Sequence, residues 1–178
     1  VRDVGDIAVI ASGNLGLLWF THTDDRLLLS SIQELWPNLV AGLAAHPQIA
    51  AVVVDSASGL LAVGRHGVRY LEGDEAGKVE GEDPLTGFGI SPQEAARDLA
   101  RAGRLPNTGD LLVISGMTRG RIHAFEHQVG SHGGLGGDQN RSVLLHPAEL
   151  ARDQAEYVGA DAVFHQLVAW QRELGLRP

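Results

Sequence analysis

The residues with the clearest capacity for chemistry are those of Gly130–Gly137, Gly-Ser-His-Gly-Gly-Leu-Gly-Gly, where His132 is the only strong candidate for a metal ligand. An imidazole titrates near neutral pH, so His132 could act as a base or bind a metal ion. Four of the five residues after His132 are glycine, and glycine lets a ligand approach the main chain closely. We therefore expect a binding site here, with Gly133 and Gly134 contacting substrate. The alternative is a flexible turn with an exposed histidine.

The runs on either side of this loop, Arg121–Val129 and Ser142–Leu145, have the pattern of strands. A rigid scaffold would then hold the loop in place. The loop could instead bind an anion through its backbone amides, but no Lys-Ser/Thr pair or helix start follows it, as a phosphate loop requires. We expect His123 and His127 on the first run to be structural, and five further histidines to be surface or capping residues: His22, His46, His66, His146 and His165.

The composition limits the classes of protein to which the chain can belong. With 178 residues, 44% of them hydrophobic and 20% charged, the chain is expected to form one globular domain over residues 1–178. A net charge of −8 with scattered basic residues argues against nucleic acid as a partner. Because there is no cysteine, a metal would have to be held by histidine, carboxylate or amide groups. No apolar run is long enough for a membrane helix, and the start of the chain, at Val1, suits a piece of a longer protein.

Three short apolar runs are typical of strands buried on both faces, and they predict a mostly parallel central sheet containing Ile7–Ala11, Ala51–Val54 and Leu111–Ile114. Ligands bind where the strands of such sheets end. Ser12–Asn14, directly after the first run, is therefore a possible site, with a plain sharp turn as the alternative. Further strands are expected at Leu15–Phe20, Leu60–Val63 and Val68–Leu71.

Helices are predicted from their start signals. Ser31 and Glu34 have the spacing of a capping box, and so have Ser91 and Glu94, which begin a predicted helix at Pro92–Ala102. A long helical pattern covers Pro147–Leu174, with an apolar stripe expected to lie in the core. The remaining predicted elements are a helix after Trp36-Pro37, Asn38–Ala45, and an exposed acidic loop, Glu72–Gly89.

The segments Gly130–Gly137, Asp6–Phe20, Glu82–Leu85 and Asp110–Ser115 resemble the C-terminal part of the alkaline phosphatase superfamily. The similarity is to the branch of type I phosphodiesterases and nucleotide pyrophosphatases, in particular to bacterial members fused to a small holin-like membrane segment. It covers about the first 150 residues. The resemblance implies the incomplete C-terminal portion of an α/β/α sandwich with a mostly parallel central sheet and metal ions at the strand ends.

The resemblance also implies a two-zinc hydrolase of phosphate mono- or diesters, in which two cations stabilise the attacking and leaving oxygens. His132 matches the family's last metal-binding histidine. Where the family has an Asp-His-Gly motif this chain has Ser12-Gly13-Asn14, which leaves Asn14 as a second and weaker candidate metal ligand. The family's serine or threonine nucleophile belongs to its N-terminal half, so no catalytic residue is expected in this chain.

The expected function is thus the C-terminal portion of a metal-dependent phosphoester hydrolase, with a phosphate ester as substrate. The upstream half of the same protein would complete the site, and a membrane would be contacted only through a missing upstream segment. We expect His132 near the end of Ile7–Ala11, Asn14 facing the same cleft, and Glu126 or Asp138 on the second ring nitrogen. One alternative is a non-catalytic binding or regulatory module with a degraded metal site. Another is a membrane-proximal assembly domain without a ligand.

Overall fold

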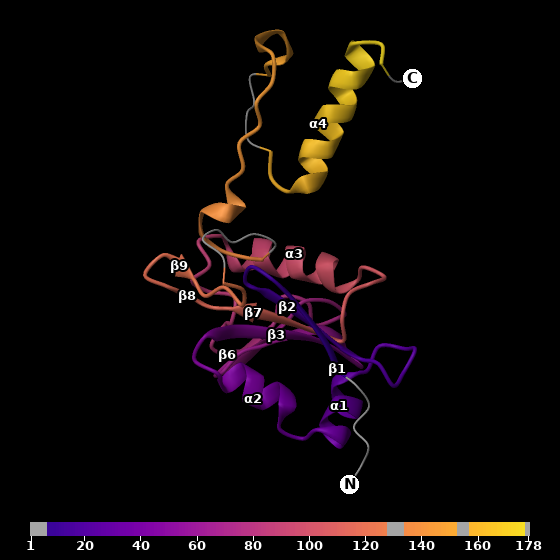
Figure 1. Ribbon diagram of the computed structural model, residues 1–178, viewed down its shortest axis with the longest axis vertical. Coiled ribbons are helices and arrows are strands. Elements are labelled where there is room, and N and C mark those ends of the chain that lie inside the picture. The colour runs from indigo at the N-terminus through magenta and orange to yellow at the C-terminus, as the bar shows by residue number, and fades with distance from the viewer. Residues whose placement is uncertain (1–6, 128–133, 153–156, 177–178) are drawn as a thin grey trace. The chain divides into compact units, whose positions relative to one another are not determined.

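Apolar runs of the chain form one seven-stranded sheet in the computed structural model, which describes residues 7–127, 134–152 and 157–176. The sheet has the strand order β1-β2-β7-β3-β4-β5-β6, and each neighbouring pair is antiparallel. Figure 1 shows α3 (Pro92–Gly103) on one side of this sheet and α1 (Leu29–Leu35) and α2 (Leu39–Ala45) on the other. The strands are β1 (Ile7–Ser12), β2 (Leu15–Phe20), β3 (Ile49–Ser56), β4 (Gly59–Val63), β5 (Gly67–Tyr70), β6 (Val79–Gly81) and β7 (Leu111–Ser115).

The α/β/α sandwich with a mostly parallel central sheet is therefore wrong, although its three predicted strands are present as parts of β1, β3 and β7. The physical reason lies in the connections. Only Gly13 and Asn14 separate β1 from β2, and an equally short turn separates β3 from β4. A turn of two residues reverses the chain into an antiparallel hairpin, whereas parallel neighbours need a crossover of a dozen or more residues.

Helices pack on both faces of this sheet, which explains why the buried stretches Ala51–Val54 of β3 and Leu111–Ile114 of β7 are continuously apolar. The helices α1 (Leu29–Leu35) and α2 (Leu39–Ala45) share one buried cluster with Val52, and the opposite cluster contains Val53. Consecutive strand residues point to opposite faces, and both valines are fully buried. A continuous apolar run thus indicates a strand whose two faces are both covered by other elements. It does not indicate a parallel sheet, because the strands here are antiparallel and covered on both faces.

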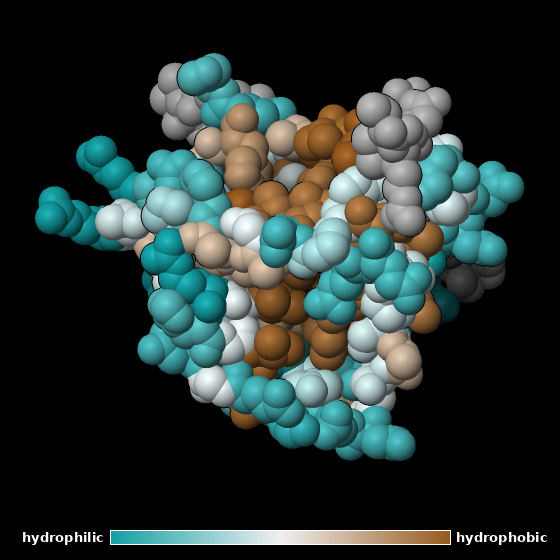
Figure 2. All heavy atoms as spheres, turned by 90° about the horizontal axis from the view of Figure 1, so that it is seen from below, coloured by the Kyte–Doolittle hydropathy of each residue, from teal (hydrophilic) through white to brown (hydrophobic). Residues whose placement is uncertain are grey.

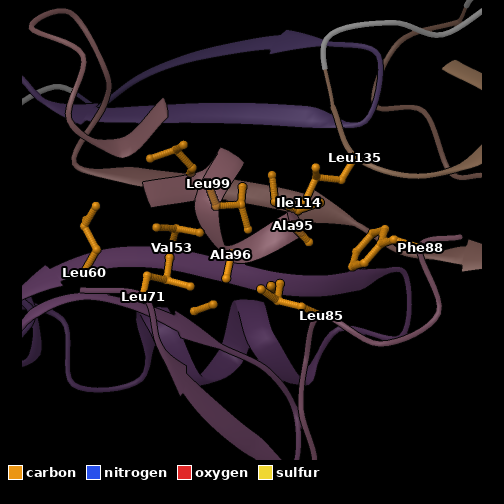
Figure 3. Packing of buried hydrophobic residues seen from close by; sticks show 13 residues of the cluster. Val53, Leu60, Leu71, Leu85, Phe88, Ala95, Ala96, Leu99, Ile114 and Leu135 are labelled. Carbon is orange, nitrogen blue, oxygen red and sulfur yellow. The ribbon is translucent and has the colours of Figure 1, made fainter. Parts of the chain in front are cut away.

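The helix α3 (Pro92–Gly103) confirms the predicted helix over Pro92–Ala102 and its capping box. The Ser91 hydroxyl accepts a hydrogen bond of 3.1 Å from the Glu94 backbone N–H, and the Glu94 carboxylate accepts one of 3.0 Å from the Ser91 backbone N–H. Figure 3 shows the side of α3 that packs on the sheet, where Ala95 and Leu99 lie among the buried strand residues.

The predicted capping box at Ser31 and Glu34 is wrong. The helix α1 already begins at Leu29, its N-cap Leu28 makes no side-chain capping bond, and Ser31 lies inside the helix. Leu29 packs against the buried cluster beneath α1 and α2. Packing of this apolar residue therefore accompanies a helix start three residues before the position that the spacing of Ser31 and Glu34 would give.

The segment Glu72–Gly89 was expected to be an exposed loop, but it contributes β6 and two core residues. Leu85 and Phe88 are buried in the cluster under α3. Asp83 fixes the turn that points Leu85 inward, because its carboxylate accepts a 3.0 Å hydrogen bond from the Leu85 N–H and pairs with the guanidinium of Arg69. This part of the motif that suggested the phosphatase resemblance therefore has a structural role in the protein.

The runs that flank the glycine-rich loop are not the predicted strands. Within Arg121–Val129, only Arg121–Ile122 is a strand, β9, which pairs with β8 (Met117–Thr118); residues 128 and 129 lie outside the described residues. Ser142–Leu145 has no regular structure. The loop is therefore attached to the sheet by side chains and turns, as described below, and not by continuous strands.

Contacts divide the chain into Val1–Arg141 and Ser142–Pro178, which are described separately, and the prediction of one domain over residues 1–178 stays a prediction. In the second unit the long predicted helix is only α4 (Ala160–Glu173), preceded by a short 3-10 turn, Ala148–Leu150. Gly159 has a φ of 85°, which is incompatible with a helix continuing through it. Of the described residues in the predicted apolar stripe, Trp170 alone is buried. Within the described ranges, no helix has the length and apolar character needed to cross a membrane.

Candidate functional site

The turn between β1 and β2 is a junction for three distant parts of the chain. Gly13 takes a positive φ of 59°, and its carbonyl accepts a 2.8 Å hydrogen bond from the Phe125 N–H. The Gly13 N–H donates to the Glu126 carboxylate at 3.1 Å. At the next residue, the Asn14 carbonyl accepts a 3.0 Å hydrogen bond from Ser115 at the end of β7. The sheet edge and the segment before the glycine-rich loop are thus joined at this turn.

The side chain of Asn14 joins the same turn to the segment after position 133. Its Nδ2 donates to the Leu135 carbonyl at 2.7 Å, and its Oδ1 accepts from Gln139 Nε2 at 3.0 Å. Gln139 Nε2 also lies 3.1 Å from the Leu135 carbonyl. Asn14 is 0% exposed, so this network lies inside the protein, where an unpaired amide would be unfavourable.

The glycines in the described half of the loop are explained by close packing. A Cβ atom on Gly134 would lie 1.9 Å from Asn14 Oδ1, a separation that no real side chain could adopt. Gly136 has a φ of 94°, and a Cβ there would lie 2.9 Å from the Phe88 ring. Between them, Leu135 is buried, and Figure 3 shows its side chain pointing into the core near Ile114. Only glycine fits on either side of this anchor.

The residues predicted for the site are only partly visible together. Asn14 and Gly134 are in direct proximity, whereas His132 and Gly133 lie outside the described residues, so the predicted meeting of His132 and Asn14 stays a prediction. Glu126, named as a candidate for the second ring nitrogen of His132, is bonded to the Gly13 N–H. The other candidate, Asp138, is an exposed residue of the 3-10 helix Gly137–Asn140.

The described residues do not by themselves make up a zinc site. Zinc takes three or four protein ligands, usually imidazole, thiolate or carboxylate. Among residues 7–127, 134–152 and 157–176, no group of three histidine, cysteine or acidic side chains is placed to hold a metal ion. Asn14 is buried, and both polar atoms of its amide are bonded within the protein. Asn14 thus holds the segment that follows residue 133.

An apolar cavity of about 520 Å³ lies on the α2 side of this junction. Leu39, Leu43 and Ile49 line it, together with Ser115 and Phe125, which also bond to the β1–β2 turn. Figure 2, seen from the side of α1 and α2, shows hydrophobic residues through the middle of this face with hydrophilic residues around them. Because Ser115 and Phe125 both line the cavity and bond to the β1–β2 turn, the cavity lies next to the candidate site.

A second, larger cavity of about 780 Å³ is lined by polar and apolar residues, and two of its charged residues, Asp110 and Arg26, are engaged in structural bonds. Asp110 accepts hydrogen bonds from the backbone N–H groups of Phe20 and Leu27, at 2.9 and 2.7 Å. Arg26 donates to the carbonyl of Gly103, at the end of α3, and to that of Thr108 in the following loop. These contacts join the segment after β2 to the end of α3 and the start of β7.

Most histidines outside the loop have packing or turn contacts. His22 lies edge-on to Phe20 and Trp36, His46 Nδ1 accepts the Gln48 N–H at 3.2 Å, and His146 lies 4.9 Å from the Trp170 ring. His123 Nε2 is 2.9 Å from the Thr118 hydroxyl. These contacts agree with structural roles.

Sequence reasoning missed Leu135 and Gln139. The signal was a single leucine among glycines, which indicates an apolar anchor in a tightly packed loop. Gln139 carried no such pattern, because its partners Asn14 and Leu135 meet only in the folded chain.

No family model matches the chain, and neither a curated protein nor a solved structure matches it.

Proposed function

We propose that this chain is the C-terminal portion of a metal-dependent phosphoester hydrolase, and that it presents His132 on the glycine-rich loop to a site completed by residues upstream. The observation that supports this proposal is that Glu126 and Leu135, which lie on the two sides of residues 128–133, both bond to the Gly13-Asn14 turn. Binding groups on loops work best when a rigid scaffold fixes the loop ends. The bonds to this turn supply such fixation at the edge of the sheet.

The roles of the residues follow from this attachment. His132 would supply a neutral imidazole to a divalent metal, zinc being the ion that the phosphatase resemblance implies, and Gly133 and Gly134 would let a phosphate ester approach the backbone. When bound, such metals stabilise the attacking and leaving oxygens of phosphoryl transfer. Asn14 would act by positioning the loop. The sheet is antiparallel, unlike the parallel sheet that the phosphatase resemblance implies. The support for the proposal therefore comes from the attachment of this loop and not from the fold.

A second candidate function is a non-catalytic binding or regulatory module, and the state of Asn14 favours it. At the position where the resemblance would place an Asp-His pair, the protein has a glycine and a buried asparagine that holds a loop. A chain that keeps the loop but lacks these ligands could bind a phosphate ester without hydrolysing it. The two candidates differ in turnover, which can be measured directly.

The test compares His132→Ala with His165→Ala in the product of the complete reading frame. His165 is an exposed residue of α4, so it is a matched control. We expect His132→Ala to lower bound metal and the turnover of a chromogenic phosphodiester at least tenfold, and His165→Ala to change neither. The 178-residue chain alone should show no turnover with added zinc or manganese. Equal, negligible effects of both substitutions would refute the proposal, and phosphate-ester binding without turnover would favour the regulatory module.

A further inference from the structure

The apolar cavity beside α2 has the size of a small-molecule site. Its volume of about 520 Å³ lies within the range of about 300–1,000 Å³ that is usual for such sites. The aliphatic residues Leu39, Leu43 and Ile49 line it, and each is only half-buried by the protein itself. Phe125, also in the lining, is 41% exposed. These side chains present apolar surface that a bound ligand would remove from water.

The part of the lining that follows β7 is fixed by hydrogen bonds. The Phe125 N–H donates to the Gly13 carbonyl at 2.8 Å, and the His123 N–H donates to the Gly116 carbonyl at 3.1 Å. The Ser115 hydroxyl donates to the His123 carbonyl. Small-molecule sites are usually formed largely before the ligand arrives. These bonds give the cavity a wall of that kind.

Gly42 leaves space in the lining that its helix does not require. It lies inside α2, where glycine is less favourable than alanine by about 0.5–1 kcal/mol. Outside its own helix, none of the described residues brings an atom within 4 Å of a Cβ built at Gly42. Close packing therefore explains Gly134, where a Cβ would meet Asn14 at 1.9 Å, but not Gly42. The absent side chain keeps this part of the cavity open.

The polar groups of the lining favour a ligand that accepts hydrogen bonds. His46 Nδ1 accepts the Gln48 N–H at 3.2 Å, so a neutral ring carries its proton on Nε2, which can donate to a ligand. His123 also lines the cavity, and the Asn38 side chain, which makes no capping bond, adds an amide. No described residue of this lining is acidic, whereas four aspartates line the larger cavity. A carboxylate would thus find donors and no like charge in the wall.

We propose that this cavity binds a small apolar carboxylate, with its hydrocarbon part against Leu39, Leu43 and Phe125 and its carboxylate at His46. Since His46 is exposed, the charged end of the ligand stays partly in water and avoids the cost of full burial. An amine of the same length would fit the apolar wall equally well but would find no acidic partner among the described lining residues. The lining contains no described residue of the glycine-rich loop, so the proposal does not depend on a metal or on His132.

The experiment titrates the 178-residue chain with decanoate and with decylammonium, which have the same hydrocarbon chain and opposite charges, and follows the backbone amides by NMR. We expect saturable shifts that are largest at residues 38–49 and 115–125, and an affinity for decanoate at least tenfold higher than for decylammonium. Gly42→Leu should weaken decanoate binding at least tenfold, because the new side chain fills the cavity. The matched control is Ala41→Leu, at an exposed position of α2 outside the lining, which should leave binding unchanged. Leucine favours a helix over glycine, so Gly42→Leu should unfold at or above the wild-type temperature.

A second pair of variants tests the contact with the carboxylate. His46→Ala should weaken the binding of decanoate at least fivefold and leave that of decylammonium unchanged. His66→Ala, at an exposed histidine between β4 and β5, should affect neither. Equal affinities of the wild type for the two probes would overturn the proposal. It would also be overturned by the absence of saturable shifts at the lining residues, or by unchanged decanoate binding in Gly42→Leu.

Discussion

The side-chain amide of Asn14 donates a 2.7 Å hydrogen bond to the backbone carbonyl of Leu135, 121 positions later in the chain. Asn14 has no exposed surface and Leu135 is also buried, so water cannot easily replace either partner. The first turn of the sheet thereby holds a segment that has no strand or long helix of its own. The position of the described half of the glycine-rich loop depends on this bond and on its neighbour from Gln139.

Replacing Asn14 by alanine should loosen this segment. The Leu135 carbonyl would lose its Asn14 donor and Gln139 would lose its acceptor at Asn14, so we expect a loss of about 1–3 kcal/mol in the free energy of unfolding. Urea denaturation measures the loss, and hydrogen exchange should rise most in residues 134–140. The matched control is Asn38→Ala, since Asn38 is exposed and makes no side-chain capping bond. Equal effects at the two positions would contradict the anchoring role of Asn14.

Gly134→Ala should destabilise the protein through a clash with the same asparagine. The added Cβ would meet Asn14 Oδ1 at 1.9 Å, so the loop or the asparagine must move. Because the two residues share one contact, their effects should not add: Gly134→Ala combined with Asn14→Ala should lose less stability than the sum of the two single changes. Thermal unfolding of the four proteins provides this cycle.

The control for that cycle is Gly42→Ala in the interior of α2. Nothing lies within 4 Å of a Cβ at Gly42, and alanine favours a helix over glycine by about 0.5–1 kcal/mol. Gly42→Ala should therefore raise the unfolding temperature. Additive losses for Gly134 and Asn14 would show that the cost of Gly134→Ala does not come from contact with Asn14, and the close-packing argument would fail.

The sequence predicted α3 and the strands of the main sheet other than β6, because their signals are local. Alternating or continuous apolar runs mark β1, β3 and β7, and the Ser91-Pro92 start marks α3. The direction of the strands was predicted wrongly, although the two-residue turns that favour hairpins are a local signal. Helices cover both faces of the central strands, and this cover gave antiparallel strands the continuous apolar runs that are typical of a parallel sheet.

The candidate site was predictable in part for the same reason. The glycine spacing located the loop, and the end of the first strand located Asn14 in the same region. The role of Asn14 could not be predicted, because it depends on Leu135 and Gln139, which are far away in sequence and reach it only through the fold. The role of Glu126 was likewise set by a long-range bond, to the Gly13 N–H.

Asp110→Ala should be among the more destabilising changes in the first unit. The Asp110 carboxylate is nearly buried and accepts the backbone N–H groups of Phe20 and Leu27. Since a hydrogen bond to a charged group contributes about 1.5–3 kcal/mol, we expect the free energy of unfolding to fall by roughly 3 kcal/mol. Chemical denaturation should show a smaller loss for Asp110→Asn, which keeps one acceptor oxygen. The exposed control Asp24→Ala should be close to neutral, and a similar loss there would contradict the argument.

The last prediction concerns pH and the start of α3. Hydrogen bonds from the Ser91 backbone N–H and hydroxyl to the Glu94 carboxylate lower the pKa of Glu94 below its ordinary value. A group whose pKa is lower in the folded state contributes stability above its unfolded pKa, about 4.3 for glutamate, and loses that contribution as pH falls through the folded pKa. Glu94→Gln should therefore lower the unfolding temperature at pH 6, and the difference from the wild type should shrink below about pH 4.

Ser91→Ala tests the other half of the capping box. This substitution should lower the free energy of unfolding by about 1 kcal/mol at pH 6, the usual effect of removing a serine N-cap. It should also flatten the pH dependence, because the hydroxyl no longer stabilises the carboxylate of Glu94. The control Gln93→Ala, at a non-ionisable residue of the same helical turn, should give a curve of unfolding temperature against pH that runs parallel to the wild type. If the difference between Glu94→Gln and the wild type stayed constant from pH 6 to pH 3, the carboxylate would not be the group whose ionisation stabilises this helix start.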